Sequence, residues 1–125
     1  MRNESVLRPG ITIDFKKDRI RIYKRTLRII GDPEYILLLV NPEDCTLAIM
    51  RSDRYDLRAY RLPRVRFGDK QSFEITSKSL MQNLLSMCDK WQANHLYRIY
   101  GELIKNEGVV QFNLTESFLA CGTRG

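Results

Sequence analysis

Two sets of basic residues carry the clearest chemistry in this 125-residue sequence. The guanidinium of arginine is planar and always charged, and it donates paired hydrogen bonds to phosphates and carboxylates; lysine offers a compact charge. The first set consists of Lys16, Lys17, Arg19, Arg21, Lys24, Arg25 and Arg28. The second set consists of Arg51, Arg54, Arg58, Arg61, Arg64 and Arg66. Both sets therefore indicate binding of phosphate or of acidic groups.

The formal net charge of +6 is unevenly distributed along the chain. Residues 1–30 hold nine Lys and Arg against three acids, residues 50–70 hold seven against three, and the remainder holds five against nine. Segregated positive charge attracts phosphate, an acidic protein or an anionic lipid surface. For the arginines of both sets, the alternative is a solvated face paired with acids such as Asp53, Asp56 and Asp69, and such pairs contribute little.

Enzyme chemistry has little support in the sequence. The single histidine, His95, has no patterned carboxylate or thiol to orient it, although Cys88 and Asp89 lie nearby in the chain. There is no glycine-rich phosphate loop, no nucleophile elbow and no carboxylate cluster with metal-ligand spacing. We therefore expect a protein that is not an enzyme and that uses no metal or other cofactor.

The three cysteines, Cys45, Cys88 and Cys121, are odd in number and far apart. They predict neither a disulfide framework nor a zinc site, and Cys45 and Cys88 fall in apolar patterns typical of buried thiols. The first residues lack the apolar stretch of a secretory signal, and no apolar run approaches the ~20 residues of a membrane helix. These features predict a cytoplasmic protein with no membrane partner.

The first half of the chain predicts a hairpin, a short helix and a second hairpin. Alternation predicts strands over 11–15 and 19–23, which places Arg19 and Arg21 together on the outward face. A helix over 24–30 ends at Gly31, and 35–40 is a continuous apolar run typical of a strand covered on both faces. After turn chemistry at 41–44, residues 45–50 return as a strand.

The arginines at positions 51, 54, 58 and 61 have spacings that would align on one face if the connection 51–70 were helical. Tyr23, Tyr55 and Tyr60 interleave with basic residues, which suits base stacking in single strands, although tyrosines also fill the rim of a barrel.

The second half repeats this order more loosely. A strand over 73–75 precedes a helix from Lys78 to about Gln92, which Ser77 can cap. Its apolar stripe is typical of a core, with a partner groove as the alternative; it consists of Leu80, Leu84, Met87 and Trp91. A strand over 95–105 with a bulge at Gly101, a turn at 106–108 and a strand over 109–114 complete the unit.

These patterns predict an α+β fold that is mainly β, with duplicated strand-helix-hairpin units forming a small barrel. Residues 1–10 are a flexible N-terminal arm and 11–114 a single domain. Its pseudo-repeats, 11–51 and 73–114, are joined by the basic connection 52–72. Residues 115–125 form a tail whose apolar patch, Phe118 to Cys121, can pack on the barrel or at a subunit contact.

The order of elements resembles the swapped-hairpin module of the AbrB-like transcription regulators, and the doubling resembles their MraZ branch. The resemblance rests on residues 19–51, with the helix closing on Gly31 and an acidic turn between strands, and more weakly on 73–114. Asp18 and Tyr23 depart from the glycine and proline common in the family, and the second helix is longer than usual. The resemblance implies a barrel completed by another chain, with DNA lying along Arg19, Arg21, Lys24, Arg25 and Arg28.

The leading hypothesis is a small nucleic-acid-binding protein, specifically a DNA-binding transcription regulator that forms a homo-oligomer. Outward cations on rigid elements release counterions when they meet a phosphate backbone. The alternative is a protein interaction module, an adaptor or inhibitor whose basic face engages an acidic protein partner.

Overall fold

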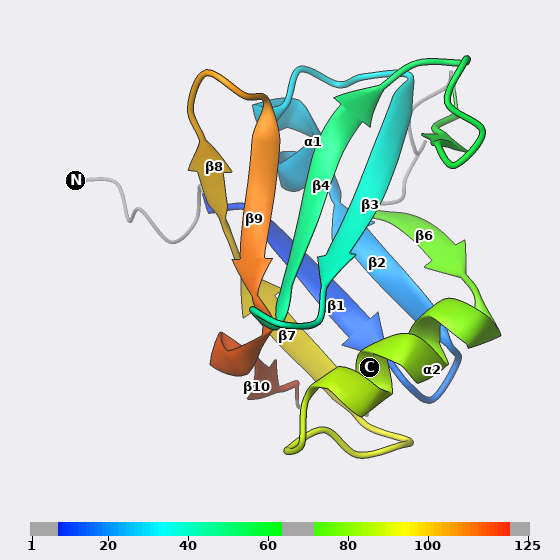
Figure 1. Ribbon diagram of the computed structural model, residues 1–125, viewed down its shortest axis with the longest axis vertical. Helices are drawn as coiled ribbons and strands as arrows, with labels where there is room; N and C mark the ends of the chain where they lie inside the picture. The colour runs from blue at the N-terminus through cyan, green and yellow to red at the C-terminus, as the bar shows by residue number, and fades with distance from the viewer. Residues whose placement is uncertain (1–7, 64–71, 121–125) are drawn as a thin grey trace.

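The computed structural model describes residues 8–63 and 72–120. Two antiparallel sheets of five strands each pack face to face, with helix α1 near one end and helix α2 near the other (Figure 1). The prediction of a mainly β protein is confirmed. A closed barrel is not seen in the described chain, because each sheet remains open with two edge strands.

The first sheet, here called sheet A, contains the strands on both sides of β1. Its order across the sheet is β10 (Phe118–Leu119), β7 (Leu96–Tyr100), β1 (Gly10–Asp14), β2 (Arg19–Tyr23) and β6 (Ser72–Thr76). The predicted hairpin of β1 and β2 is confirmed, with Ile11 opposite Ile22 and Asp14 opposite Arg19.

The second sheet, sheet B, is built around the hairpin of β3 and β4. Its order is β5 (Tyr60–Arg61), β3 (Tyr35–Asn41), β4 (Thr46–Ser52), β9 (Val109–Asn113) and β8 (Glu102–Ile104). After β9, a 3₁₀ turn over Leu114–Glu116 leads to β10. The expectation that β3 is covered on both faces fails at its second half, where Leu39 is exposed.

In the first half of the described chain, strand, helix and hairpin follow one another as β2, α1 and β3–β4; in the second half, β7 of sheet A stands between α2 and the hairpin β8–β9. The strands that precede the two helices, β2 and β6, pair with each other in sheet A. The last strands of the two hairpins, β4 and β9, pair in sheet B. Each sheet therefore contains a pair of neighbouring strands from different halves of the chain.

The helices begin and end for local reasons. α1 (Lys24–Ile29) ends as predicted before Gly31, whose φ of +89° suits glycine. α2 (Lys78–Met87) begins at Ser77, whose Oγ accepts a 3.2 Å hydrogen bond from the backbone N–H of Leu80. It ends five residues earlier than predicted, because Cys88 is extended.

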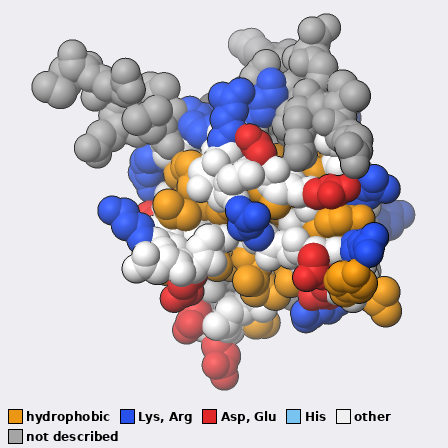
Figure 2. Space-filling view, turned by 90° about the horizontal axis from the view of Figure 1, so that it is seen from above, with side chains coloured by type: hydrophobic (Ala, Val, Ile, Leu, Met, Phe, Trp, Pro, Cys, Tyr) orange, Lys and Arg blue, Asp and Glu red, His pale blue; other side chains and the backbone are white. Residues whose placement is uncertain are grey.

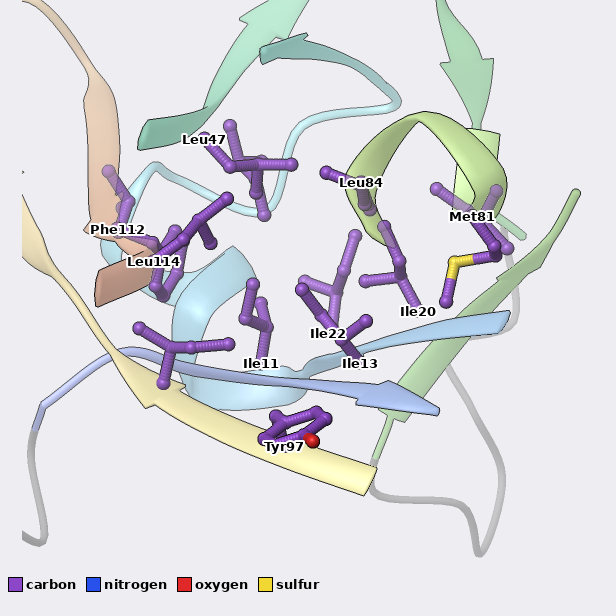
Figure 3. Packing of buried hydrophobic residues seen from close by; sticks show 14 of the residues in the cluster. Ile11, Ile13, Ile20, Ile22, Leu47, Met81, Leu84, Tyr97, Phe112 and Leu114 are labelled. Atoms are coloured by element: carbon purple, nitrogen blue, oxygen red, sulfur yellow. The ribbon is translucent and has the colours of Figure 1, made fainter. Parts of the chain in front are cut away.

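The core lies between the sheets and under α2 (Figure 3). Alternate residues of β1 and β2 point inward and are fully buried: Ile11, Ile13, Ile20 and Ile22. Sheet B contributes Leu47 and Phe112, while Met81 and Leu84 of α2 close the same cluster. Of the predicted stripe, Leu84 and Trp91 are buried and Leu80 and Met87 half-buried, which favours the core interpretation over a partner groove.

The connection after β4 is not helical over its described part. The chain continues as β4 to Ser52, passes through turns and pairs β5 with β3. The arginines at 51, 54, 58 and 61 therefore do not share a helical face. Arg64 and Arg66 lie outside the described residues.

Candidate nucleic-acid interface

The outer face of sheet A carries polar side chains that the strand alternation turns away from the core. Register places a row of residues side by side across five strands: Phe118, Arg98, Thr12, Arg21 and Glu74. Neighbouring strands lie about 4.8 Å apart, so Arg98 and Arg21 flank the small Thr12 from about 10 Å apart. Thr12 is only 2% exposed, because longer neighbours cover it.

Arg19 is held by two carboxylates. Its Nε lies 3.0 Å from Oδ2 of Asp14, and its Nη1 lies 3.0 Å from Oε1 of Glu74. Asp14 is buried and also accepts hydrogen bonds from the backbone N–H groups of Lys16 and Lys17. Arg19 therefore braces the β1–β2 turn, and its charge is largely compensated, whereas the side chains of Lys16 and Lys17 are exposed.

Arg21 and Arg98 occupy the two sides of Thr12 differently. Nε of Arg21 lies 3.2 Å from Oε2 of Glu74, so part of its charge is compensated. Nη2 of Arg98 donates a 2.7 Å hydrogen bond to the hydroxyl of Tyr23, which shares a 2.7 Å hydrogen bond with Thr12 Oγ1. Among the described residues Arg98 has no ion pair.

A groove of about 410 Å³ opens on this face. Below, "the sheet A groove" means the hollow lined by Thr12, Arg21, Tyr23, Leu96, Arg98, Phe118, Leu119 and Ala120. One side is cationic and the other apolar, because Phe118 and Leu119 are about half exposed on the edge strand β10. The ring of Phe118 stacks on Tyr100, with centroids 6.0 Å apart.

A second cationic surface lies at the end of the molecule that α1 occupies. Arg28 is exposed in the last turn of α1. Nη1 of Arg51 donates a 3.3 Å hydrogen bond to the carbonyl oxygen of Ile30. Cations are favoured there, since a helix C-terminus is partially negative. No described acid forms an ion pair with Arg28 or Arg51. Below, "the α1 end" means Lys24, Arg25, Arg28 and Arg51.

Figure 2 views the molecule from above and shows a group of Lys and Arg side chains between the two grey segments, with one acidic side chain at its border and further acidic and basic side chains spread over the rest of this face. The structure does not keep the two basic sets of the sequence apart as two separate surfaces. Arg51, from the second set, joins the helix of the first, while Arg19 is withdrawn into an ion-pair network.

Of the remaining described arginines of the second set, Arg58 and Arg61 pair with carboxylates and Arg54 bonds a tyrosine hydroxyl. Arg58 lies 3.0 Å from Asp56, and its hydrogen bond lowers the pKa of that carboxyl below its ordinary value. Arg61 lies 3.6 Å from Glu34. Arg54 donates to the hydroxyl of Tyr55 at 2.8 Å. Arg58 and Arg61 therefore fit the solvated-face alternative better. Arg61, however, pairs with Glu34 and not with one of the three aspartates expected.

Arg98 is the residue that sequence reasoning missed. The alternation of Leu96, Arg98 and Tyr100 in the predicted strand indicates that Arg98 points outward. The sequence does not predict that β7 pairs with β1, and this pairing brings Arg98 beside Thr12 and Tyr23.

The single histidine, His95, lies directly before β7 and contacts its near neighbours in the chain. Nδ1 of His95 lies 3.0 Å from the carbonyl oxygen of Ala93, and its ring stacks on Tyr97. In the described part of the chain, no three His, Cys, Asp or Glu side chains are placed to hold a metal ion. With six residues in α1 and ten in α2, neither described α-helix is long enough to cross a membrane.

The chain was compared with known proteins on the basis of both sequence and fold. It matches no protein-family model, no curated protein and no solved structure at the significance required. The resemblance to the AbrB-like regulators therefore stays a prediction.

Proposed function

We propose that this protein binds nucleic acid through phosphate contacts made at the α1 end. The observation that carries the proposal is that Arg28 lies in the last turn of α1 and Arg51 bonds the carbonyl oxygen of Ile30 just after it, both exposed and neither in an ion pair with a described acid. Guanidinium groups of this kind match phosphate oxygens in geometry and charge.

The surface around these two residues supports the same function. α1 follows β2 directly, so the cationic residues continue from Arg21 on sheet A through Lys24 and Arg25 to Arg28. The fixed backbone of a strand and a helix reduces the entropy lost on binding. Contacts to phosphate position a nucleic acid without reading its sequence.

Binding is tested by fluorescence anisotropy with labelled duplex DNA and a labelled single strand, at several salt concentrations. For duplex DNA, the logarithm of the association constant falls by about 0.9 per phosphate contact for each logarithmic unit of salt. The double variant Arg28→Gln/Arg51→Gln should weaken binding and flatten that dependence by about two contacts.

The matched control is Arg58→Gln/Arg61→Gln. It removes two exposed arginines as well, but each of these already pairs with a carboxylate, Arg58 with Asp56 and Arg61 with Glu34. Its binding should stay close to that of the parent protein. Binding that is absent at low salt, or equal losses in both double variants, would contradict the proposal.

A transcription regulator of duplex DNA is the specific form of this function that the sequence predicts. Tighter binding of the duplex than of the single strand would support this form, and a preference for the single strand would contradict it. The swapped-hairpin barrel and the homo-oligomer implied by the resemblance belong to the same proposal, and the mass of the protein in solution tests whether a second chain takes part.

A second candidate is binding of an acidic protein partner, as in an adaptor or inhibitor. The observation that favours it is the pair Phe118 and Leu119, which leaves apolar surface exposed beside Arg98. Aromatic residues and arginine are enriched at protein interfaces. A stoichiometric protein complex that survives nuclease treatment and is lost on Phe118→Ala would support this candidate.

A further inference from the structure

We infer that the sheet A groove binds one unpaired nucleotide, so that the protein prefers single-stranded nucleic acid to a duplex. The inference rests on the proposed function, because it names the form of nucleic acid that the protein takes. It depends on residues separate from the α1 end, chiefly Arg98 and Phe118.

The cationic side of the groove is held in place before any ligand arrives. Arg98 is fixed by its 2.7 Å hydrogen bond to Tyr23, and Tyr23 is fixed in turn by Thr12. A guanidinium that is already oriented loses less conformational freedom when it meets an anion. Lys or Arg side chains that point freely into solvent lack this advantage.

Arg98 retains unused hydrogen-bonding capacity. Its Nε is shielded from solvent and has no hydrogen-bond partner among the described residues. Because Nε has no exposed surface and the centroid of the Tyr23 ring lies 5.1 Å from Cζ, a phosphate in the groove would meet the outer N–H groups of the guanidinium rather than Nε. Arg21, on the other side of Thr12, is partly compensated by Glu74 and therefore contributes less charge.

The opposite side of the groove suits a flat ring. Phe118 is about half exposed, and Tyr100 supports its ring from one side at 6.0 Å between centroids. Leu96 and Leu119 extend the apolar surface. Bases of single strands stack on exposed aromatic side chains with little dependence on sequence.

An unpaired nucleotide combines the two chemistries that the groove offers. Its phosphate can approach Arg98 while its base lies on Phe118. A base inside a duplex already has both faces stacked on its neighbours and cannot reach a ring on a sheet face. The volume of about 410 Å³ falls in the range of small-molecule sites.

The test compares a labelled ten-nucleotide oligothymidylate with a labelled duplex hairpin in the same anisotropy assay. The parent protein should bind the single strand more tightly. Phe118→Ala should weaken binding of the single strand at least about fivefold and leave the duplex nearly unchanged. Arg98→Gln should act in the same direction.

Two matched controls separate the groove from general effects of composition. Leu57→Ala removes a fully exposed apolar side chain far from the groove in sequence. Arg54→Gln removes an arginine that, like Arg98, donates to a tyrosine hydroxyl, here that of Tyr55. Neither should change binding of the single strand, and thermal denaturation confirms that all variants are folded.

Failure of the inference is distinguishable from failure of the proposed function. Equal binding of both nucleic acids, weakened by Arg28→Gln/Arg51→Gln but not by Phe118→Ala, would overturn the groove and leave the function standing. No binding of either would overturn both. Binding of a labelled acidic peptide in place of nucleic acid, lost on Phe118→Ala, would assign the groove to a protein and overturn the inference.

Discussion

Arg98 on β7 donates a 2.7 Å hydrogen bond to the hydroxyl of Tyr23 on β2, across the intervening strand β1. The two residues are 75 positions apart in the sequence. Since Tyr23 also bonds Thr12 on β1, one hydroxyl ties together the three central strands of sheet A. The same contact orients the guanidinium that lines the sheet A groove.

Removal of that hydroxyl should cost measurable stability. In Tyr23→Phe, Arg98 and the buried Thr12 each lose a partner while the ring remains. A lost hydrogen bond of this kind lowers the free energy of unfolding by about 1 kcal/mol. Urea denaturation measures the difference. Tyr55→Phe is the control, because its bond to Arg54 is exposed, and equal losses in the two variants would refute the argument.

Asp14 should matter more for stability than Glu74, although both contact Arg19. Asp14 is 2% exposed and also holds the N–H groups of Lys16 and Lys17. Asp14→Ala should therefore lower the free energy of unfolding by about 2 to 3 kcal/mol, as expected when buried partners of a charged group are left unsatisfied.

Glu74→Ala is the comparison for Asp14. The Glu74 side chain is 38% exposed, and its pairs with Arg19 and Arg21 are worth at most about 1 kcal/mol each in such surroundings. Denaturant titrations of both variants decide the order. A larger loss for Glu74→Ala than for Asp14→Ala would show that the turn does not depend on Asp14.

The strands were predictable where alternation is strict. Ile20 and Ile22 point to one side of β2 and Arg19 and Arg21 to the other, and a period of two residues sets this without regard to the rest of the fold. Contacts that depend on strand pairing were not predictable. Glu74, which compensates Arg19, lies 55 residues away and reaches it only because β6 pairs with β2.

The predicted second helix was too long for a similar reason. Trp91 continues the helical spacing of Leu84 and is buried as that pattern requires, but it is placed by a turn. Its Nε1 donates a 2.8 Å hydrogen bond to Oγ of Ser117, from the segment after β9. Trp91 is therefore buried without belonging to the helix, because a segment distant in the sequence packs around it.

Gly101 marks the point where the chain leaves β7 in sheet A and enters β8 in sheet B. A Cβ there would lie 2.6 Å from the backbone oxygen of Gln111 and 2.7 Å from the ring of Phe112. Gly101→Ala should therefore destabilise the protein by about 1 to 3 kcal/mol or more, measured as a lower Tm.

Gly10→Ala is the control for Gly101. A Cβ at Gly10 would meet only side-chain atoms, the nearest being ring carbons of Tyr100 at 3.4 Å. Its loss of stability should be clearly smaller. A similar drop in Tm for both variants would mean that the crossing between the sheets tolerates a side chain.

The thiols of Cys45 and Cys88 should differ in reactivity. Burial raises the pKa of the Cys88 thiol above its ordinary value of 9.0, and the neighbouring Cys45 raises it further. A raised pKa leaves less thiolate at neutral pH, and thiolate is the form that reacts. Cys45 is half-buried, so an alkylating reagent should modify it first.

The measurement uses Cys121→Ser, since Cys121 lies outside the described residues and would add a third label. Mass spectrometry of peptides after timed alkylation gives a rate for each thiol. The rate for Cys88 should stay low at pH 7 and still be rising at pH 9, without levelling off below it. Burial and the neighbouring Cys45 each suppress the thiolate of Cys88. A rate for Cys88 equal to that of Cys45, or a plateau below pH 9, would therefore show that neither effect operates.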